Sequence, residues 1–123
     1  LIIVNFANGD MVGHTAIKDA IVLAMEALDA VLGEVVCAAI GKDVSTLITA
    51  DHGNADEINN PITGKPNTQH SLNPVPCIVV DNNRTWEIVN HSGGLSNIAP
   101  TLLTLMDIEK PKEMTASSLI KEN

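Results

Sequence analysis

Two side chains that commonly bind metal ions stand next to each other where a short apolar segment ends. Asp51 and His52 follow residues 46–50, three of which are β-branched, and precede Gly53. A strand of this kind delivers its last residues to the carboxyl edge of a sheet, where open α/β proteins bind ligands. Neighbouring strand residues point to opposite faces, so both side chains can serve one site only if the chain turns here, which Gly53 permits. A loop with an ordinary surface histidine is the alternative interpretation.

A second pair, Asp10 and His14, lies four positions apart. On a helical turn the two side chains would share one face and could chelate one ion. Gly9 and Gly13 favour a bend from loop into helix over a regular helix, and such a bend can also bring the pair together. Asp10 could instead act only as a helix cap.

A third loop contributes His70, which taken alone is uninformative. The combined donors are carboxylate oxygens and imidazole nitrogens without a thiolate, which suits Mn²⁺ or Zn²⁺. Five donors exceed one tetrahedral site, so we expect two ions, which in two-metal enzymes lie about 3.5–4 Å apart. The full candidate set is Asp10, His14, Asp51, His52 and His70. We interpret His91 as a surface residue, and Asp56 and Glu57 as solvated loop charges.

The surrounding pattern predicts an α/β protein with a partly parallel sheet flanked by helices, folded as one domain over residues 1–123. Residues 1–6 are apolar enough for a strand buried on both faces, and an amphipathic helix follows over 15–40, with Gly41 as its left-handed cap. With a strand at 44–50 this makes a βαβ unit. The remaining expected elements are a functional loop at 53–74, a strand at 75–80, a turn at 81–84, an edge strand at 85–89, a helix at 98–106 capped by Ser96 or Asn97, and a tail at 111–123 with at most one short element.

Composition narrows the choice of partners. A formal charge of −8 disfavours nucleic acid and anionic membrane surfaces, and one Phe, one Trp and no Tyr leave no stacking platform for bases. No apolar run reaches the roughly 20 residues of a membrane span. We expect Cys37 and Cys77 to be small buried hydrophobes in a reduced, cytoplasmic setting. Arg84 is the single arginine. A phosphorylated carboxylate is usually bound by several arginines, so most of the residues needed to bind such a substrate are missing.

Four ordered motifs resemble the C-terminal part of cofactor-independent (2,3-bisphosphoglycerate-independent) phosphoglycerate mutase, in the alkaline phosphatase superfamily. The resemblance covers essentially the whole chain, and it departs from the usual family pattern at Ala16, where Gly is usual, and at Asn97, where Asp is usual. We therefore expect a segment of a longer chain and an alkaline-phosphatase-like fold. The motifs are Asn-Gly-Asp-Met-Val-Gly-His-Thr at 8–15, Thr-Ala-Asp-His-Gly-Asn-Ala at 49–55, Thr-x-His-Ser-x-x-Pro-Val-Pro at 68–76 and Gly-Leu-Ser-x-Ile-Ala-Pro-Thr-Leu-Leu at 94–103.

The resemblance implies roles for the five candidate residues. Asp10, His14 and His70 would hold one Mn²⁺, and Asp51 with His52 would form part of a second Mn²⁺ site, with Zn²⁺ or Mg²⁺ as substitutes. In the family an aspartate and the nucleophilic serine complete that second site, and neither is in this chain. No residue here is therefore assigned as catalytic or as binding an organic cofactor.

The implied parent enzyme interconverts 2-phosphoglycerate and 3-phosphoglycerate in glycolysis through a phosphoserine intermediate, as a cytoplasmic monomer. We expect this chain alone to be inactive and to self-associate through unpaired strand edges. The alternatives are another superfamily enzyme, such as a phosphopentomutase or phosphohydrolase, and a non-catalytic metal-binding module.

Overall fold

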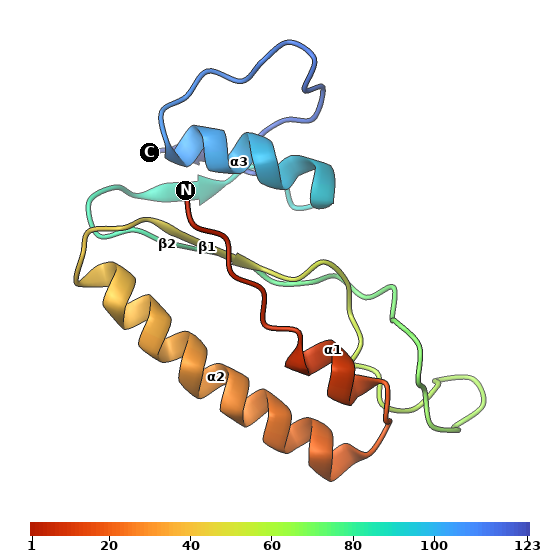
Figure 1. The fold of residues 1–123 in the computed structure, drawn as a ribbon. Coiled ribbons are helices and arrows are strands. Elements are labelled where there is room, and N and C mark those ends of the chain that lie inside the picture. The colour runs from red at the N-terminus through yellow and green to blue at the C-terminus, as the bar shows by residue number, and fades with distance from the viewer. The chain divides into compact units, whose positions relative to one another are not determined.

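A computed structural model describes all of residues 1–123 (Figure 1). The chain divides into two compact units. Unit 1 comprises Leu1–Ala38 and Thr49–Pro76, and unit 2 comprises Ala39–Ile48 and Cys77–Asn123. Two small sheets form, one from β1 and β2 and one from β3 and β4. The elements in chain order are α1 (Asn8–Gly13), α2 (Lys18–Ile40), β1 (Thr46–Thr49), β2 (Cys77–Val80), β3 (Trp86–Ile88), the 3₁₀ turn η1 (Leu95–Asn97), α3 (Ile98–Leu105) and β4 (Ile120–Glu122).

The predicted amphipathic helix is present as α2, the long orange helix of Figure 1. Its inner face follows the expected three-to-four spacing, with Ile21 buried and Leu28 and Leu32 half-buried. Ile17, expected on the same stripe, is exposed because it precedes the helix. Cys37 was expected to be buried and is exposed, because it lies one position off the inner face.

The expected strand at residues 1–6 is wrong. This segment has no ladder partner, and the apolar side chains of residues 1–4 are exposed, from 59% at Val4 to 86% at Ile2. A strand needs a neighbour to satisfy its backbone groups, and no other strand of this chain pairs with it. The βαβ unit is therefore not formed within these residues. The chain instead enters α1 directly, a short helix where we expected only a bend.

The predicted left-handed cap at Gly41 is also wrong, because Asp43 takes that conformation, with φ 54°. The N–H of Val44 donates to the carbonyl of Ala39, and the N–H of Asp43 donates to the carbonyl of Ile40. These two bonds are the Schellman pattern that satisfies the last carbonyls of a helix. α3 ends in the same way, with Asp107 at φ 54°.

Ala16 occupies the left-handed region as well, with φ 50°, in the turn between α1 and α2. A Cβ atom in this region costs roughly 1 kcal/mol, whereas glycine adopts it freely. We expect Ala16→Gly to raise the free energy of unfolding by about 0.5–1 kcal/mol, measured by urea denaturation. The matched control is Ala30→Gly at an exposed position inside α2, which should lose about 1 kcal/mol. An Ala16→Gly protein no more stable than wild type would contradict this account.

The apolar core of unit 2 is built from segments far apart in the sequence. β3 and β4 pair antiparallel, with Trp86 opposite Glu122 and Ile88 opposite Ile120. This pairing places Leu119 and Ile120 beside Leu105 of α3, and these three are the buried hydrophobic residues of the cluster. The single short element expected in the tail is thus β4, and it supplies much of the core.

Asn97 does not cap α3 with its side chain, contrary to expectation. Its Oδ1 accepts the N–H of Gly94 at 2.9 Å, and its Nδ2 donates to the carbonyl of Ser117 at 2.8 Å. The residue therefore joins the start of η1 to the C-terminal tail, because its side chain is turned back toward the preceding residues.

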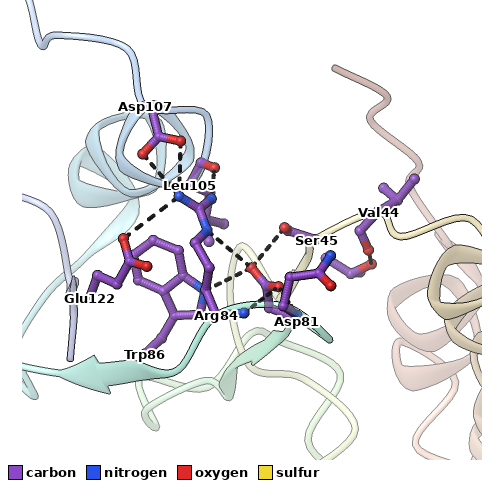
Figure 2. A network of polar contacts seen from close by, with 10 residues as sticks. Val44, Ser45, Asp81, Arg84, Trp86, Leu105, Asp107 and Glu122 are labelled. Carbon is purple, nitrogen blue, oxygen red and sulfur yellow. Dashed lines mark hydrogen bonds and ion pairs between the residues drawn. The ribbon is translucent and has the colours of Figure 1, made fainter.

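Arg84 is held by a polar network in unit 2 (Figure 2). Its Nη1 donates to both carboxylate oxygens of Asp107 at 2.9 Å, and its Nη2 donates to the carbonyl of Leu105 at the end of α3. The guanidinium also lies 4.5 Å from the ring centroid of Trp86. Arg84 therefore secures a helix end, and its donors face the protein.

None of the helices combines the length and the apolar character that crossing a membrane requires.

Candidate metal centre

Three imidazoles surround one carboxylate oxygen in unit 1. The Oδ1 atom of Asp10 lies 3.0 Å from Nε2 of His70, 3.2 Å from Nε2 of His14 and 3.9 Å from Nε2 of His52. The donor atoms of Asp10, His52 and His70 all lie within 4.8 Å of one another. Four of the five candidates from the sequence are thus brought together by the fold.

These spacings are close to those between the ligands of one divalent ion. Protein ligands lie about 2.0–2.2 Å from Zn²⁺, so two ligands of one tetrahedral ion are roughly 3.3–3.6 Å apart. The oxygen–nitrogen distances around Asp10 bracket this range. The donor set of one carboxylate and several imidazoles, with no cysteine, suits Mn²⁺, Zn²⁺ and similar ions.

Three different local elements position the four donors. Asp10 lies in the first turn of α1 and His14 follows the last residue of that helix, so the two share one face as the four-residue spacing predicted. His52 follows the end of β1, where the chain turns at Gly53. His70 lies near the end of the 53–74 loop, which folds back on itself through a bridge between Asn59 and Pro66.

His14 is oriented by its second ring nitrogen. Its Nδ1 lies 2.7 Å from the carbonyl oxygen of Thr68, an acceptor that requires a proton on Nδ1. The other ring nitrogen, Nε2, faces Oδ1 of Asp10 at 3.2 Å. Metal-binding histidines are commonly fixed through their other nitrogen in this way.

Asn54 orients the central carboxylate. Its Nδ2 donates to Oδ1 of Asp10 at 2.7 Å, and this hydrogen bond is the main reason why the pKa of Asp10 is lowered, with the three histidines adding to the effect. Asn54 is only 7% exposed, and its Oδ1 has no hydrogen-bond partner. The sequence motif contained Asn54, but a polar residue beside Gly53 gave no sign that it would be buried against Asp10.

Asp51 stands apart from the other candidates. Its side chain is 75% exposed, and its Oδ1 lies 3.6 Å from Nε2 of His52. Asp51 and His52 therefore can face a common ion, but Asp51 does not join the group centred on Asp10.

Asp56 was expected to be a solvated charge, and the residue is exposed, but its carboxylate is also held by hydrogen bonds. Its carboxylate accepts hydrogen bonds from Asn73 and Ser71, which together lower its pKa, with Asn73 contributing most. The donors lie fifteen or more positions away, so no local pattern could reveal them. Ser71 has a hydrogen-bonding role, as hydroxyl groups in such loops usually do.

Gly13 leaves no room for a side chain beside the centre. A Cβ atom there would lie 2.3 Å from Oδ1 and 2.7 Å from Cγ of Asn54. We expect Gly13→Ala to displace Asn54, to misorient Asp10 and to weaken Mn²⁺ binding about tenfold by calorimetric titration. Gly33→Ala is the matched control, because its Cβ would meet nothing within 4 Å. Equal affinities for the two variants would show that Asn54 does not matter for the centre.

A metal-type donor cluster on an α/β scaffold defines the class of this protein, and the chain belongs to the metalloenzyme superfamily, whose family model matches residues 1–110. Within that class it is similar to 2,3-bisphosphoglycerate-independent phosphoglycerate mutases. It is 48% identical over 122 residues to that of Symbiobacterium thermophilum, covering 99% of this chain and 23% of the relative. With that of Vesicomyosocius okutanii it is 52% identical over 120 residues, covering 98% and 23%.

A solved structure gives the same result. Crystal structures of Leishmania mexicana phosphoglycerate mutase at low cobalt concentration match with a TM-score of 0.83 and 32% sequence identity, covering 97% of this chain and 24% of that one. The resemblance inferred from the four motifs is confirmed, and the alkaline-phosphatase-like fold class with it. The chain spans about a quarter of the length of the relatives it matches.

Proposed function

We propose that this chain is the metal-binding part of a phosphoglycerate mutase that interconverts 2-phosphoglycerate and 3-phosphoglycerate through a phosphoserine intermediate. The observation that carries the proposal is the convergence of three imidazole Nε2 atoms on Oδ1 of Asp10. About half of the residues are identical to those of named phosphoglycerate mutases over nearly the whole chain, which supports this enzyme within the superfamily.

The proposed metal is Mn²⁺, with Zn²⁺ or Mg²⁺ as substitutes. Asp10, His14 and His70 would hold one ion, and Asp51 with His52 would contribute to a second. A bound divalent ion supplies positive charge that stabilises a transferring phosphoryl group and lowers the pKa of an attacking hydroxyl. Because the Asp51 side chain is 75% exposed and lies outside the Asp10 group, we expect the isolated chain to retain one ion at the Asp10 set.

The phosphoryl-accepting hydroxyl is proposed to come from residues other than those of this chain. Ser71, the serine next to a candidate ligand, is 6% exposed and donates its hydroxyl proton to Asp56. Arg84 faces Asp107 and Leu105, so it has no free fork for a substrate phosphate. The isolated 123 residues should therefore show no mutase turnover.

The proposed setting follows from that enzyme class. We place the parent in glycolysis, in the cytoplasm and as a monomer, with the negatively charged chain having neither nucleic acid nor membrane as a partner. The isolated chain should self-associate, because its exposed apolar residues 1–4 and short edge strands lack partners. Residues 1–123 are proposed to form part of one phosphatase-like domain in the parent.

A chimera tests the proposal. The matching 122-residue segment of the Symbiobacterium thermophilum mutase is replaced by this chain, and conversion of 3-phosphoglycerate is measured with Mn²⁺ present. We expect turnover in the range typical of enzymes, about 1–1000 per second, and none from the same chimera with Asp10→Asn. A folded chimera that is inactive, or one that keeps its activity with Asp10→Asn, would refute the proposal.

A further inference from the structure

The loops that carry His52 and His70 are joined directly beside these histidines. Gly53 and Ser71 form an antiparallel bridge, in which the N–H of Ser71 donates to the carbonyl of Gly53 at 2.9 Å. Gly53 directly follows His52 and Ser71 directly follows His70. The bridge therefore fixes the relative positions of the two backbone segments that carry the imidazoles. The two rings are stacked, with centroids 3.6 Å apart and an interplanar angle of 16°.

The carboxylate of Asp56 accepts hydrogen bonds from a residue of this bridge and from a residue close to it in sequence. Ser71 Oγ donates to Oδ2 of Asp56 at 2.9 Å and lies 3.1 Å from its Oδ1. Asn73 Nδ2 donates to the same Oδ2 at 2.6 Å. We refer to Asp56, Ser71 and Asn73 together as the Asp56 clamp.

The clamp is packed tightly against the turn after His52. A Cβ atom on Gly53 would lie 2.2 Å from Oγ of Ser71 and 2.8 Å from Oδ1 of Asp56. Gly53 and Ser71 are both buried, so neither can shift without disturbing the other. The exposed Asp56 carboxylate is hydrogen-bonded to Ser71 and lies beside Gly53, which connects it to both histidine loops.

Asp56 acts as a hydrogen-bond acceptor and does not form an ion pair. Its hydrogen-bond donors are neutral, no Lys, Arg or His side chain lies within ion-pair distance, and it does not belong to the donor group around Asp10. The charge is instead used to accept several hydrogen bonds at once, which a carboxylate does more strongly than a neutral acceptor.

We propose that Asp56 is a positioning residue of the metal centre, which sets the relative position of His52 and His70 through the Asp56 clamp. The proposal rests on the metal-binding function proposed above. Outer hydrogen-bond partners of metal ligands typically alter metal affinity 10- to 100-fold when removed.

The test compares Asp56→Ala and Asp56→Asn with wild type in the full chain. The imidazole proton signals are followed by NMR without metal, where the chain has only four histidines, and Mn²⁺ affinity is measured by calorimetry. For Asp56→Ala we expect the ring-current shifts of the stacked pair to be lost and the affinity to fall about 10- to 100-fold. Asp56→Asn keeps one acceptor oxygen and should show a smaller loss.

Glu57→Gln is the matched control, because it removes a charge one residue away that accepts a hydrogen bond from Asn67 outside the clamp. It should leave both readouts unchanged. Ser71→Ala removes the hydroxyl donor of the Asp56 clamp. If Asp56→Ala does not fold, this variant tests the proposal by the same two measurements. Wild-type imidazole shifts and affinity in the clamp variants, or an equal loss in Glu57→Gln, would overturn the proposal. A wild-type chain that binds no Mn²⁺ would contradict the metal function, whereas the imidazole shifts would still test the clamp.

Discussion

Asp10→Asn is expected to weaken Mn²⁺ binding by at least 100-fold. Oδ1 of Asp10 is the one atom that faces all three imidazoles, so its charge is the centre of the donor set. The amide is nearly the same size, so the packing around the residue is kept while the negative charge is removed. Direct ligands should matter at least as much as outer partners, whose removal costs 10- to 100-fold. Calorimetric titration with MnCl₂ and electron paramagnetic resonance of free Mn²⁺ both measure this loss.

The control for this variant is Asp19→Asn, in the first turn of α2 and exposed to solvent. It removes the same charge from the same unit, so the net charge changes equally in both proteins. Mn²⁺ affinity in Asp19→Asn should stay within about twofold of wild type. If both variants bind equally well, the donors around Asp10 are not the metal centre.

Asp81→Ala is expected to lower the free energy of unfolding by about 3 kcal/mol, the largest stability loss that we predict. The Asp81 side chain is only 4% exposed. Its Oδ2 accepts hydrogen bonds from Trp86 Nε1 and Ser45 Oγ, both at 2.9 Å, and its Oδ1 accepts the backbone N–H groups of Asn83 and Arg84 (Figure 2). Truncation leaves these donors without an acceptor. Urea denaturation at pH 7 gives the value.

Glu87→Ala is the matched control for Asp81→Ala. Glu87 is an exposed carboxylate of β3 that pairs with Lys121 at 3.0 Å across the β3–β4 ladder. Exposed pairs contribute little, so a loss below about 1 kcal/mol is expected. Equal losses in the two variants would show that the network around Asp81 is not a special source of stability.

The same network predicts how stability depends on pH. The Trp86 indole N–H, followed by the Asn83 backbone N–H, holds the pKa of Asp81 well below its usual range. A carboxylate whose pKa is depressed by folding binds fewer protons in the folded state, so its contribution is fully present above the unfolded pKa, near 3.9. The contribution is lost as the pH falls from there through the folded pKa. Unfolding free energies measured between pH 5 and pH 2 should therefore fall more steeply for wild type than for Asp81→Ala.

The donor residues could be predicted from the sequence because their chemistry is local. Asp10 and His14 needed only a helical spacing, and Asp51 with His52 needed only the end of a strand. The contacts that position them are not local. Asn54 reaches Asp10 across 44 positions and Ser71 reaches Asp56 across 15, and no periodic pattern marks such pairs.

The secondary structure likewise separates into elements set by local sequence and elements set by long-range pairing. α2 and α3 follow from apolar spacing, since a helix makes its own backbone hydrogen bonds. A strand depends on a neighbour, so the apolar residues 1–6 could not form one without a partner. β4 shows the converse, because its short polar sequence became a strand only through its pairing with β3.

The engagement of Arg84 with the end of α3 has a consequence for how this segment is reused. Under the proposed function, a segment whose only guanidinium is occupied within its own fold would supply metal donors and leave recognition of a substrate phosphate to other residues. We expect the metal donors and the residues that recognise the substrate to change independently of one another in evolution.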